Sequence, residues 1–178
     1  MKIEVNEKGS REFYREVVNV TSQYQKLIKK PEGKINDNFR LLKGYILLCA
    51  IVLVIITAMG IAWGMDGLTT AAIVLLVAAI AMSGVLLYRL MRMCDSLMND
   101  PRSSVFTIDE KGIDFSKPEA EQIRIAWDHV AFVRVFDHSV CFVSKGVPGL
   151  VLALEKRWQS EVLAYIRDNH IAVTVIGG

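Results

Sequence analysis

Cysteine is scarce in this chain of 178 residues and follows no ligand pattern. The three cysteines, Cys49, Cys94 and Cys141, are odd in number, lie far apart and form no Cys-x-x-Cys pair. Disulfide-stabilised domains and structural zinc sites need paired, closely spaced cysteines. We therefore expect neither, and free thiols suit a reducing cytoplasm.

Histidine is equally scarce, and the sequence lacks a catalytic motif. His129, His138 and His170 each lie near the end of an expected strand or helix. Asp128 beside His129 resembles an acid–base pair, but neighbours on a strand or turn usually point to different sides, and no nucleophile motif accompanies them. We expect no metal ion, no cofactor and no catalytic residues.

Loops that hold phosphate or calcium are also missing. Residues Gly146–Gly149 contain two glycines but lack the following Lys and helix of a phosphate-binding loop. The acidic residues between Asp109 and Glu121 are interrupted by Lys111 and Lys117 and do not have calcium-loop spacing. A nucleotide enzyme is not expected, and the acidic residues are interpreted as a solvated hairpin tip.

Charge is absent from two long stretches, Gly44–Met65 and Gly67–Tyr88, each 22 residues long. A helix needs about 20 residues to cross a hydrocarbon core of ~30 Å. The sequence therefore predicts two transmembrane helices, over residues 44–65 and 67–90, joined by a tight turn at Asp66. Two buried helices of a soluble protein would need far more surrounding chain. With no ionisable residue inside either span, an ion pathway or proton relay is not expected.

The flanks of the two spans predict their orientation. Lys and Arg precede the first span and follow the second, whereas the turn has neither, so the positive-inside rule places both termini in the cytoplasm. Residues 1–43 carry ten Lys and Arg against six Asp and Glu, and residues 99–178 carry nine against eleven. The basic bias beside the spans favours phospholipid headgroups over nucleic acid as the anionic neighbour. The expected membrane-interface anchors are Lys29, Lys30, Arg40, Lys43, Tyr45, Trp63, Tyr88, Arg89 and Arg92.

Small residues recur at four-residue spacing in both spans. The pairs include Gly60 with Gly64 and Ala79 with Ser83. Such spacing lets two helices approach closely. We favour packing within the hairpin, although a homodimer would use the same pattern.

Residues 1–43 predict a short strand and an amphipathic helix. Ile3 and Val5 alternate with polar neighbours as in an edge strand, and Ser10 could cap a helix that runs to about Lys30, before Pro31. Its apolar stripe could lie on the membrane surface or cover the C-terminal domain, and we favour the domain. The stripe consists of Phe13, Val17, Val20, Tyr24, Leu27 and Ile28.

Residues 104–178 predict a sheet followed by a helix. Gly112 could adopt a positive φ in a hairpin loop, and Trp158, Val162 and Ile166 fall on one face of a helix over residues 155–169. We expect Trp127, Trp158 and Ile166 in the core. Strands closed by a C-terminal helix are typical of the pleckstrin-homology-like (PH-like) superfold, although other small α+β domains fit too. The six expected strands are 105–108, 113–116, 122–127, 130–136, 140–144 and 150–154.

Nearly the whole chain resembles the YcxB-like family of bacterial membrane proteins. The resemblance rests on "VFTIDEKGIDF" (105–115), "IAWDHV" (125–130) and "LALEKRW" (152–158), which carry a T-x-D-E-x-G turn and a W-x-x-V step. The family's usual Pro before the Lys–Arg pair is replaced by Glu155. The resemblance implies a PH-like cytosolic domain on a two-span anchor and supplies no catalytic residues.

The predicted fold class is an α+β membrane protein, in which a two-helix transmembrane hairpin precedes an antiparallel sheet capped by a helix. The expected location is the bacterial inner membrane, with residues 104–178 in the cytoplasm. We expect a membrane-tethered protein-interaction module whose sheet edge, or groove beside the last helix, receives a segment of a partner. An accessory or immunity-type subunit that binds through the hairpin is the alternative, and an enzyme at the bilayer surface ranks last.

A lipid-headgroup site in the C-terminal domain is a further alternative. It requires the fold to bring several hairpins together, and the interleaved carboxylates leave this domain net acidic, which argues against it. Its candidate residues are Lys111, Lys117, Arg124, Arg134 and Lys145.

Overall fold

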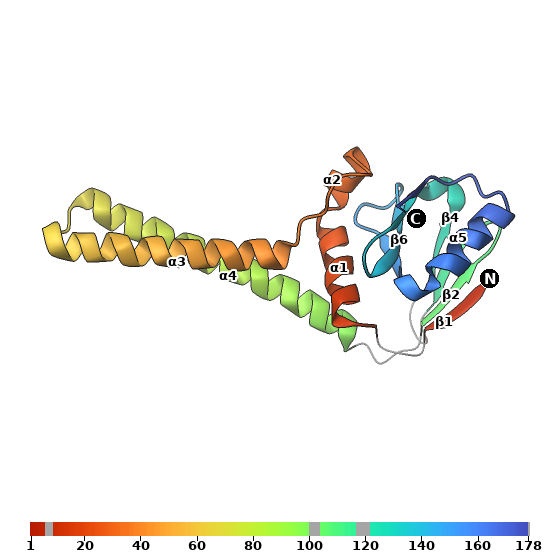
Figure 1. The fold of residues 1–178 in the computed structure, drawn as a ribbon, viewed down its shortest axis with the longest axis horizontal. Helices are drawn as coiled ribbons and strands as arrows, with labels where there is room; N and C mark the ends of the chain where they lie inside the picture. The colour runs from red at the N-terminus through yellow and green to blue at the C-terminus, as the bar shows by residue number, and fades with distance from the viewer. Residues whose placement is uncertain (6–8, 100–103, 117–121, 178) are drawn as a thin grey trace. The chain divides into compact units, whose positions relative to one another are not determined.

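The computed structural model describes residues 1–5, 9–99, 104–116 and 122–177, which form two compact units (Figure 1). Unit 1 combines Met1–Ile35 with Ser96–Gly178, and unit 2 is Asn36–Asp95. The N-terminal segment therefore belongs to the same unit as the C-terminal sheet, rather than forming a region of its own up to residue 43. The polar, turn-rich sequence of residues 99–104 predicts a boundary there, and most of it, residues 100–103, lies outside the described residues.

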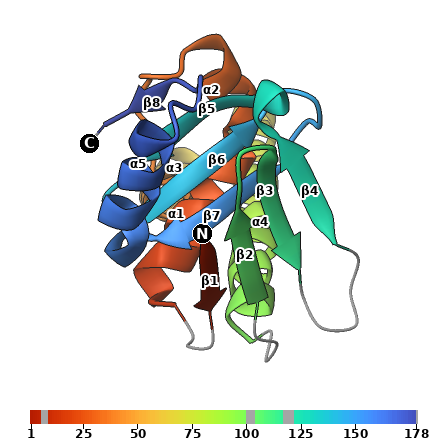
Figure 2. The same ribbon diagram turned by 90° about the vertical axis from the view of Figure 1, so that its right-hand side faces the viewer.

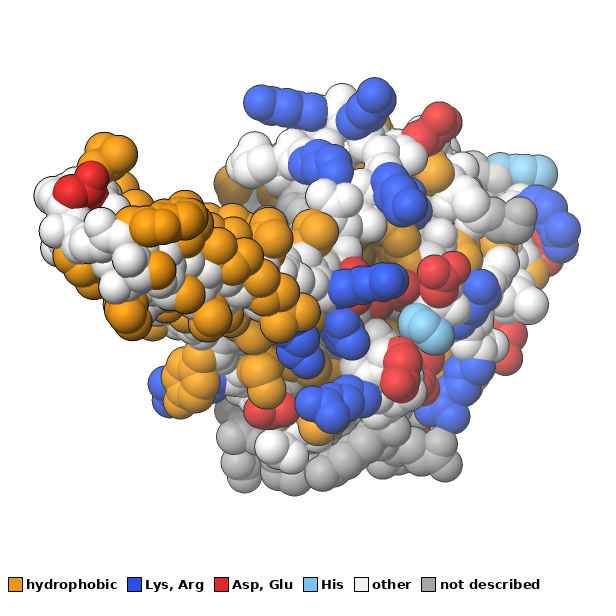
Figure 3. Space-filling model, turned by 60° about the vertical axis from the view of Figure 1, so that its left-hand side comes forward, with side chains coloured by type: hydrophobic (Ala, Val, Ile, Leu, Met, Phe, Trp, Pro, Cys, Tyr) orange, Lys and Arg blue, Asp and Glu red, His pale blue; other side chains and the backbone are white. Residues whose placement is uncertain are grey.

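Unit 2 consists mainly of two long helices, α3 (Asn38–Trp63) and α4 (Gly67–Met98, whose last turn passes into unit 1). Both helices are long and apolar enough to cross a membrane. Their large apolar side chains are mostly exposed, reaching 79% for Trp63 and 81% for Leu68, and Figure 3 shows hydrophobic side chains along their length. Since such exposure is unfavourable in water, it fits contact with lipid.

Gly60 lies where the two helices of unit 2 approach each other. A Cβ at this position would lie 2.6 Å from Sδ of Met65 and 3.1 Å from Cγ2 of Thr69. Gly64 instead ends α3 with a φ of +98°, and a Cβ there would meet nothing within 4 Å. Of the predicted pair Gly60 and Gly64, Gly60 therefore packs within the hairpin, whereas Gly64 forms part of the turn after α3.

The described residues of unit 1 form two four-stranded sheets (Figure 2). The first is antiparallel in the order β1-β2-β3-β4, and the second has the order β7-β6-β5-β8. In the second sheet β8 runs parallel to β5, whereas the other pairs are antiparallel. The predicted α+β class is confirmed, with a mixed second sheet. The strands are β1 (Lys2–Val5), β2 (Ser104–Ile108), β3 (Gly112–Ser116), β4 (Ile123–Ala126), β5 (Val130–Val135), β6 (Ser139–Ser144), β7 (Val151–Glu155) and β8 (Val175–Ile176).

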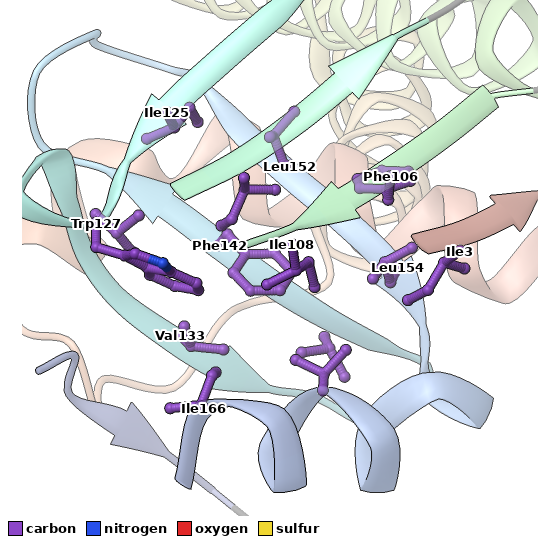
Figure 4. Close-up of a cluster of buried hydrophobic side chains, with 14 residues drawn as sticks. Ile3, Phe106, Ile108, Ile125, Trp127, Val133, Phe142, Leu152, Leu154 and Ile166 are labelled. Carbon is purple, nitrogen blue, oxygen red and sulfur yellow. The ribbon is translucent and has the colours of Figure 1, made fainter. Parts of the chain in front are cut away.

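The main core lies between the two sheets and helix α5 (Gln159–Asp168). Figure 4 shows Trp127 beside Phe142, whose ring centroids are 6.4 Å apart, and Ile166 of α5 facing Val133. Trp127 and Ile166 are buried, as predicted. Trp158 is not part of this buried core.

The prediction that Trp158 shares one helical face with Val162 and Ile166 is wrong. It lies in a short 3-10 helix, η2 (Lys156–Trp158), because α5 begins only at Gln159. A 3-10 turn rotates its side chains relative to an α-helix, so Trp158 packs against the core from the rim and stays partly exposed.

A second core lies on the opposite face of β5, β6 and β7. There Tyr24 and Leu27 pack with Phe132, Cys141 and Val143. The helices that cover this face are α1 (Arg11–Ser22) and α2 (Tyr24–Lys29). The predicted apolar stripe therefore covers the domain, and β6 is buried on both faces.

One predicted helix is two helices, separated at Gln23. The side chains of Ser22 and Gln23 both donate to the carbonyl oxygen of Asn19, at 3.0 and 3.4 Å. The backbone N–H of Gln23 also donates to this carbonyl oxygen, at 3.2 Å. The break between α1 and α2 lies at Gln23 itself, whose φ of −107° and ψ of 18° differ from helical values.

Gly112 is needed in the β2–β3 hairpin because of close packing. A Cβ at this position would collide with the carbonyl oxygen of Ile125 and lie 2.8 Å from Cα of Ala126 on β4. Only glycine allows this approach of β3 and β4.

Candidate functional site

A shallow groove of about 620 Å³ lies beside α5 in unit 1. One wall is the outer face of the helix, and the other is the chain that leads into β8. The sequence prediction named a groove beside the last helix as a site for a partner. The lining residues are Ser160, Leu163, Ala164, Ile166, Arg167, His170, Ile171 and Val175.

The helical wall comes from a second face of α5. Ser160, Leu163, Ala164 and Arg167 follow the i, i+3, i+4, i+7 spacing that brings side chains onto one helix face. The core uses the neighbouring face, which includes Val162. Leu163 and Ala164 are consequently left half-buried and available to the groove.

The second wall follows from how α5 ends. The N–H of Ile171 donates to the carbonyl oxygen of Ile166 at 3.0 Å, and that of His170 donates to the carbonyl oxygen of Arg167 at 3.1 Å. This is a Schellman motif, and His170 occupies its left-handed position with a φ of +50°. The motif reverses the chain, so that the residues before β8 run back beside the helix.

Strand β8 lies at the edge of its sheet in the described part of the chain. Its Val175 is opposite Val133 in register, and the N–H of Val133 donates to the carbonyl oxygen of Thr174 at 2.8 Å. In a parallel ladder with this bond, the N–H and C=O of Val175 point away from β5. Because Val175 also lines the groove, apolar side chains and outward backbone groups occur together.

The charges at the groove are largely balanced. Nε of Arg167 is 3.1 Å from Oδ1 of Asp168, and both side chains are mostly exposed. Arg167 and His170 also lie at the C-terminal end of α5, where positive charge stabilises the helix dipole. The groove therefore offers apolar contact and backbone pairing rather than a strong electric field.

Two of the predicted headgroup residues, Arg124 and Arg134, contact other groups within the domain. Nη2 of Arg124 lies 3.5 Å from Oδ2 of Asp109, and Nε of Arg124 lies 3.6 Å from Oδ1 of Asp114. Arg134 donates to the carbonyl oxygens of Pro31 and Gly33. Both side chains therefore already have partners, and the common basic mouth stays a prediction. Lys117 lies outside the described residues.

Lys111 and Lys145 are brought to one end of the domain. The carbonyl oxygen of Lys111 accepts from the N–H of Trp127, and the N–H of Lys145 donates to the carbonyl oxygen of His129. Both lysines therefore lie near the 3-10 helix η1 (Trp127–His129). The surroundings are not basic, because this end also carries Asp109, Glu110 and Asp128.

Asp109 organises the tip of the β2–β3 hairpin. Its Oδ1 accepts from the N–H of Lys111 at 2.8 Å and of Gly112 at 2.9 Å, and its carbonyl oxygen accepts from Nε1 of Trp127 at 2.8 Å. The backbone bond from Lys111, with smaller contributions from Gly112 and Arg124, holds the pKa of Asp109 below its usual value. The carboxylate thus stabilises the turn.

A basic surface forms instead around α2, and we call it the α2 basic face. Its members are exposed lysines at positions 26, 29, 30 and 34. Leu27 packs on the sheet, so the lysines at the i, i+3, i+4 spacing face outward. In Figure 1, α2 lies at the top of the molecule. Figure 3 is turned about the vertical axis, and several Lys and Arg side chains lie together at its top. The sequence prediction named only Lys29 and Lys30 as anchors, although the lysine spacing already indicated this face.

The remaining predicted anchors lie on the two apolar helices. Tyr45, Trp63 and Tyr88 have exposed fractions of 49%, 79% and 64%. Their rings are free for the interfacial role that the sequence predicts. The exposed basic anchors on α3 and α4 are Arg40, Lys43, Arg89 and Arg92.

Cys141 and Glu16 take structural positions between α1 and the sheet. Burial raises the pKa of Cys141 to about 12, so its thiol is neutral at physiological pH. Oε2 of Glu16 accepts from Oγ of Ser139 at 2.6 Å and from the N–H of His138 at 3.0 Å, which links α1 to β6. Among the described residues, no group of three or more His, Cys, Asp and Glu is arranged to hold a metal ion.

Comparisons with family models, curated proteins and solved structures found no match. The YcxB-like resemblance therefore stays a prediction.

Proposed function

We propose that this chain is a membrane-tethered protein-interaction module without catalytic activity. The hairpin of α3 and α4 anchors it in the bacterial inner membrane, and the sheet domain is PH-like and cytosolic, as in the YcxB-like family. One observation carries the interaction role: an apolar groove lies directly beside the free edge of β8.

The ligand is an extended segment of a protein partner. Such a segment pairs with the N–H and C=O of Val175, and its alternate side chains reach Leu163, Ala164 and Ile171. Backbone pairing supplies affinity, and the apolar wall selects the side chains. A folded partner surface would not enter a groove of this size as readily as a single strand.

Site-specific crosslinking in cells tests the groove. A photoreactive amino acid at Leu163 should crosslink one defined protein, whereas the same group at Val147, which is 54% exposed outside the groove, should not. The crosslinked segment is then made as a peptide and titrated into the full chain in nanodiscs. We expect Ala164→Trp to block binding by filling the groove.

Two results would contradict this role. Equal crosslinking from Val147 would show that Leu163 only reports random encounters. Crosslinks that arise only from Val54, a lipid-facing position that is 68% exposed on α3, would favour the accessory-subunit alternative.

Reporter fusions test the proposed orientation. Fusions joined by flexible linkers at Met1 and Gly178 should both report the cytoplasm, because the basic clusters flank those sides of the hairpin. An external C-terminus would contradict the proposed topology.

A further inference from the structure

We infer that the α2 basic face binds the anionic headgroups of phospholipids. This is a second interaction surface, independent of the groove. The face consists of Lys26, Lys29, Lys30 and Lys34, and within residues 23–35 only Glu32 carries negative charge.

The apolar side of α2 is already used. Leu27 and Tyr24 are 1% and 7% exposed, because they pack on the sheet. An amphipathic helix that inserts into a bilayer would need these side chains for lipid. The contact with lipid is therefore electrostatic, between lysine ammonium groups and phosphate or other anionic headgroup oxygens.

Hydrogen bonds hold the backbone under these lysines. Arg134 on β5 donates from Nη1 to the carbonyl oxygen of Gly33 at 2.8 Å and also to that of Pro31. The N–H of Gly33 donates to the carbonyl oxygen of Lys30 at 2.8 Å, and Nζ of Lys26 donates to that of Lys34 at 2.7 Å. The charges are thus presented from an ordered surface, which lowers the entropy cost of binding.

The covalent path to α3 identifies the bilayer as the partner. Ile35 packs in the second core of unit 1, and α3 begins at Asn38. Three residues span at most ~11 Å when fully extended. If α3 enters a bilayer, the α2 basic face cannot move far from its headgroups, where clustered lysines bind anionic lipid.

Spin labelling of the full chain in nanodiscs tests this inference. Gln25, exposed on α2, is changed to Cys and labelled in a background with Cys49→Ala and Cys94→Ala. Nickel chelated to a lipid headgroup reports whether the label lies in the headgroup layer. The discs contain phosphatidylcholine alone or a mixture with phosphatidylglycerol.

We expect nickel relaxation of the label to rise several-fold when phosphatidylglycerol is present and to fall back in about 0.5 M salt. The variant Lys26→Gln, Lys29→Gln, Lys30→Gln, Lys34→Gln should abolish this rise. A matched variant that replaces four exposed lysines elsewhere in unit 1, at positions 2, 111, 145 and 156, should keep it.

Each other outcome overturns the inference. Equal relaxation in neutral discs would mean that the contact does not depend on headgroup charge, and no relaxation in either disc would mean that there is no contact. Persistence in the quadruple α2 variant would assign the effect to other residues. Displacement of the label from anionic discs by a 20-mer oligonucleotide would identify nucleic acid as the preferred ligand.

Discussion

The phenolic hydroxyl of Tyr24 donates to the carbonyl oxygen of Ser144 at 2.5 Å. Tyr24 begins α2, and Ser144 is the last residue of β6, so this bond fastens the second helix to the end of the central strand. Both residues are buried. The contact with the sheet therefore includes a specific polar bond as well as apolar packing.

Replacing Tyr24 by Phe should lower the free energy of unfolding by about 1 to 3 kcal/mol, because the Ser144 carbonyl would lose a buried donor. Urea titration of the full chain in detergent, followed by tryptophan fluorescence, measures this effect. Tyr14→Phe is the control, since the Tyr14 hydroxyl accepts a longer bond, 3.2 Å, from the N–H of Gly9 in a partly buried place. An equal decrease in the free energy of unfolding for the two variants would argue against a special role for the Tyr24 bond.

The two tryptophans of the sheet domain should respond differently to substitution. Trp127→Ala removes a core side chain and should cost about 3 to 5 kcal/mol. Trp158→Phe should be close to neutral, because it keeps the apolar packing and removes a buried Nε1 that has no hydrogen-bond partner among the described residues. Thermal unfolding of the two variants tests the contrast, and a large loss for Trp158→Phe would place that ring in the core after all.

Cys141 should make stability depend on pH in the alkaline range. Burial raises the native pKa to about 12, whereas the unfolded thiol keeps its ordinary value of 9.0, so the native state binds the extra proton. The stabilisation that the protonated Cys141 thiol gives the native state is complete below pH 9 and is lost as the pH rises towards 12. Cys141→Ala should remove this component from stability measured between pH 8 and pH 11.

The same burial predicts slow chemical labelling of Cys141. In the Cys49→Ala, Cys94→Ala background, N-ethylmaleimide at pH 7.5 should label the native chain only through unfolding. Mass spectrometry across a urea series should show labelling that follows the unfolding transition. Rapid labelling without urea would mean that α1 opens from the sheet locally.

Gly60→Val should destabilise the hairpin by about 1 to 3 kcal/mol, because its Cβ would press on Met65 and Thr69. Gly84→Val on α4 is the matched control, since a Cβ there meets nothing within 4 Å. Titration with sodium dodecyl sulfate in mixed micelles measures the difference. Equal effects would indicate that helix propensity, rather than the close contact, determines the cost.

The sequence predicted the layout of the fold because the relevant signals are long or repeated. Two charge-free stretches indicate the apolar helices, and short runs rich in β-branched and aromatic residues indicate strands such as β5 and β6. The sequence favours docking of the N-terminal stripe on the domain, and the packing of Tyr24 and Leu27 confirms it. These features follow from patterns in neighbouring residues.

The missed features depend on contacts between distant residues. Strand β8 has only two residues, and it is a strand because Val175 and Ile176 pair with Val133 and Arg134 of β5, which no local pattern indicates. The sequence predicts Arg134 as an exposed cation, yet its guanidinium donates hydrogen bonds to the carbonyl oxygens of residues 31 and 33. The candidate groove likewise exists because the chain turns back after His170.

The pairing of β1 with β2 has a consequence for biosynthesis. Residues 2–5 leave the ribosome before their partners at 104–107, which follow only after both apolar helices have been made. Helices α1 and α2 also wait for β6 and β7 before they can bury their apolar stripe. Folding of the sheet domain must therefore follow translation of the hairpin, and until then the N-terminal segment exposes an unpaired strand and an apolar helix face. Chaperones or the membrane surface would have their best access to this chain in that interval.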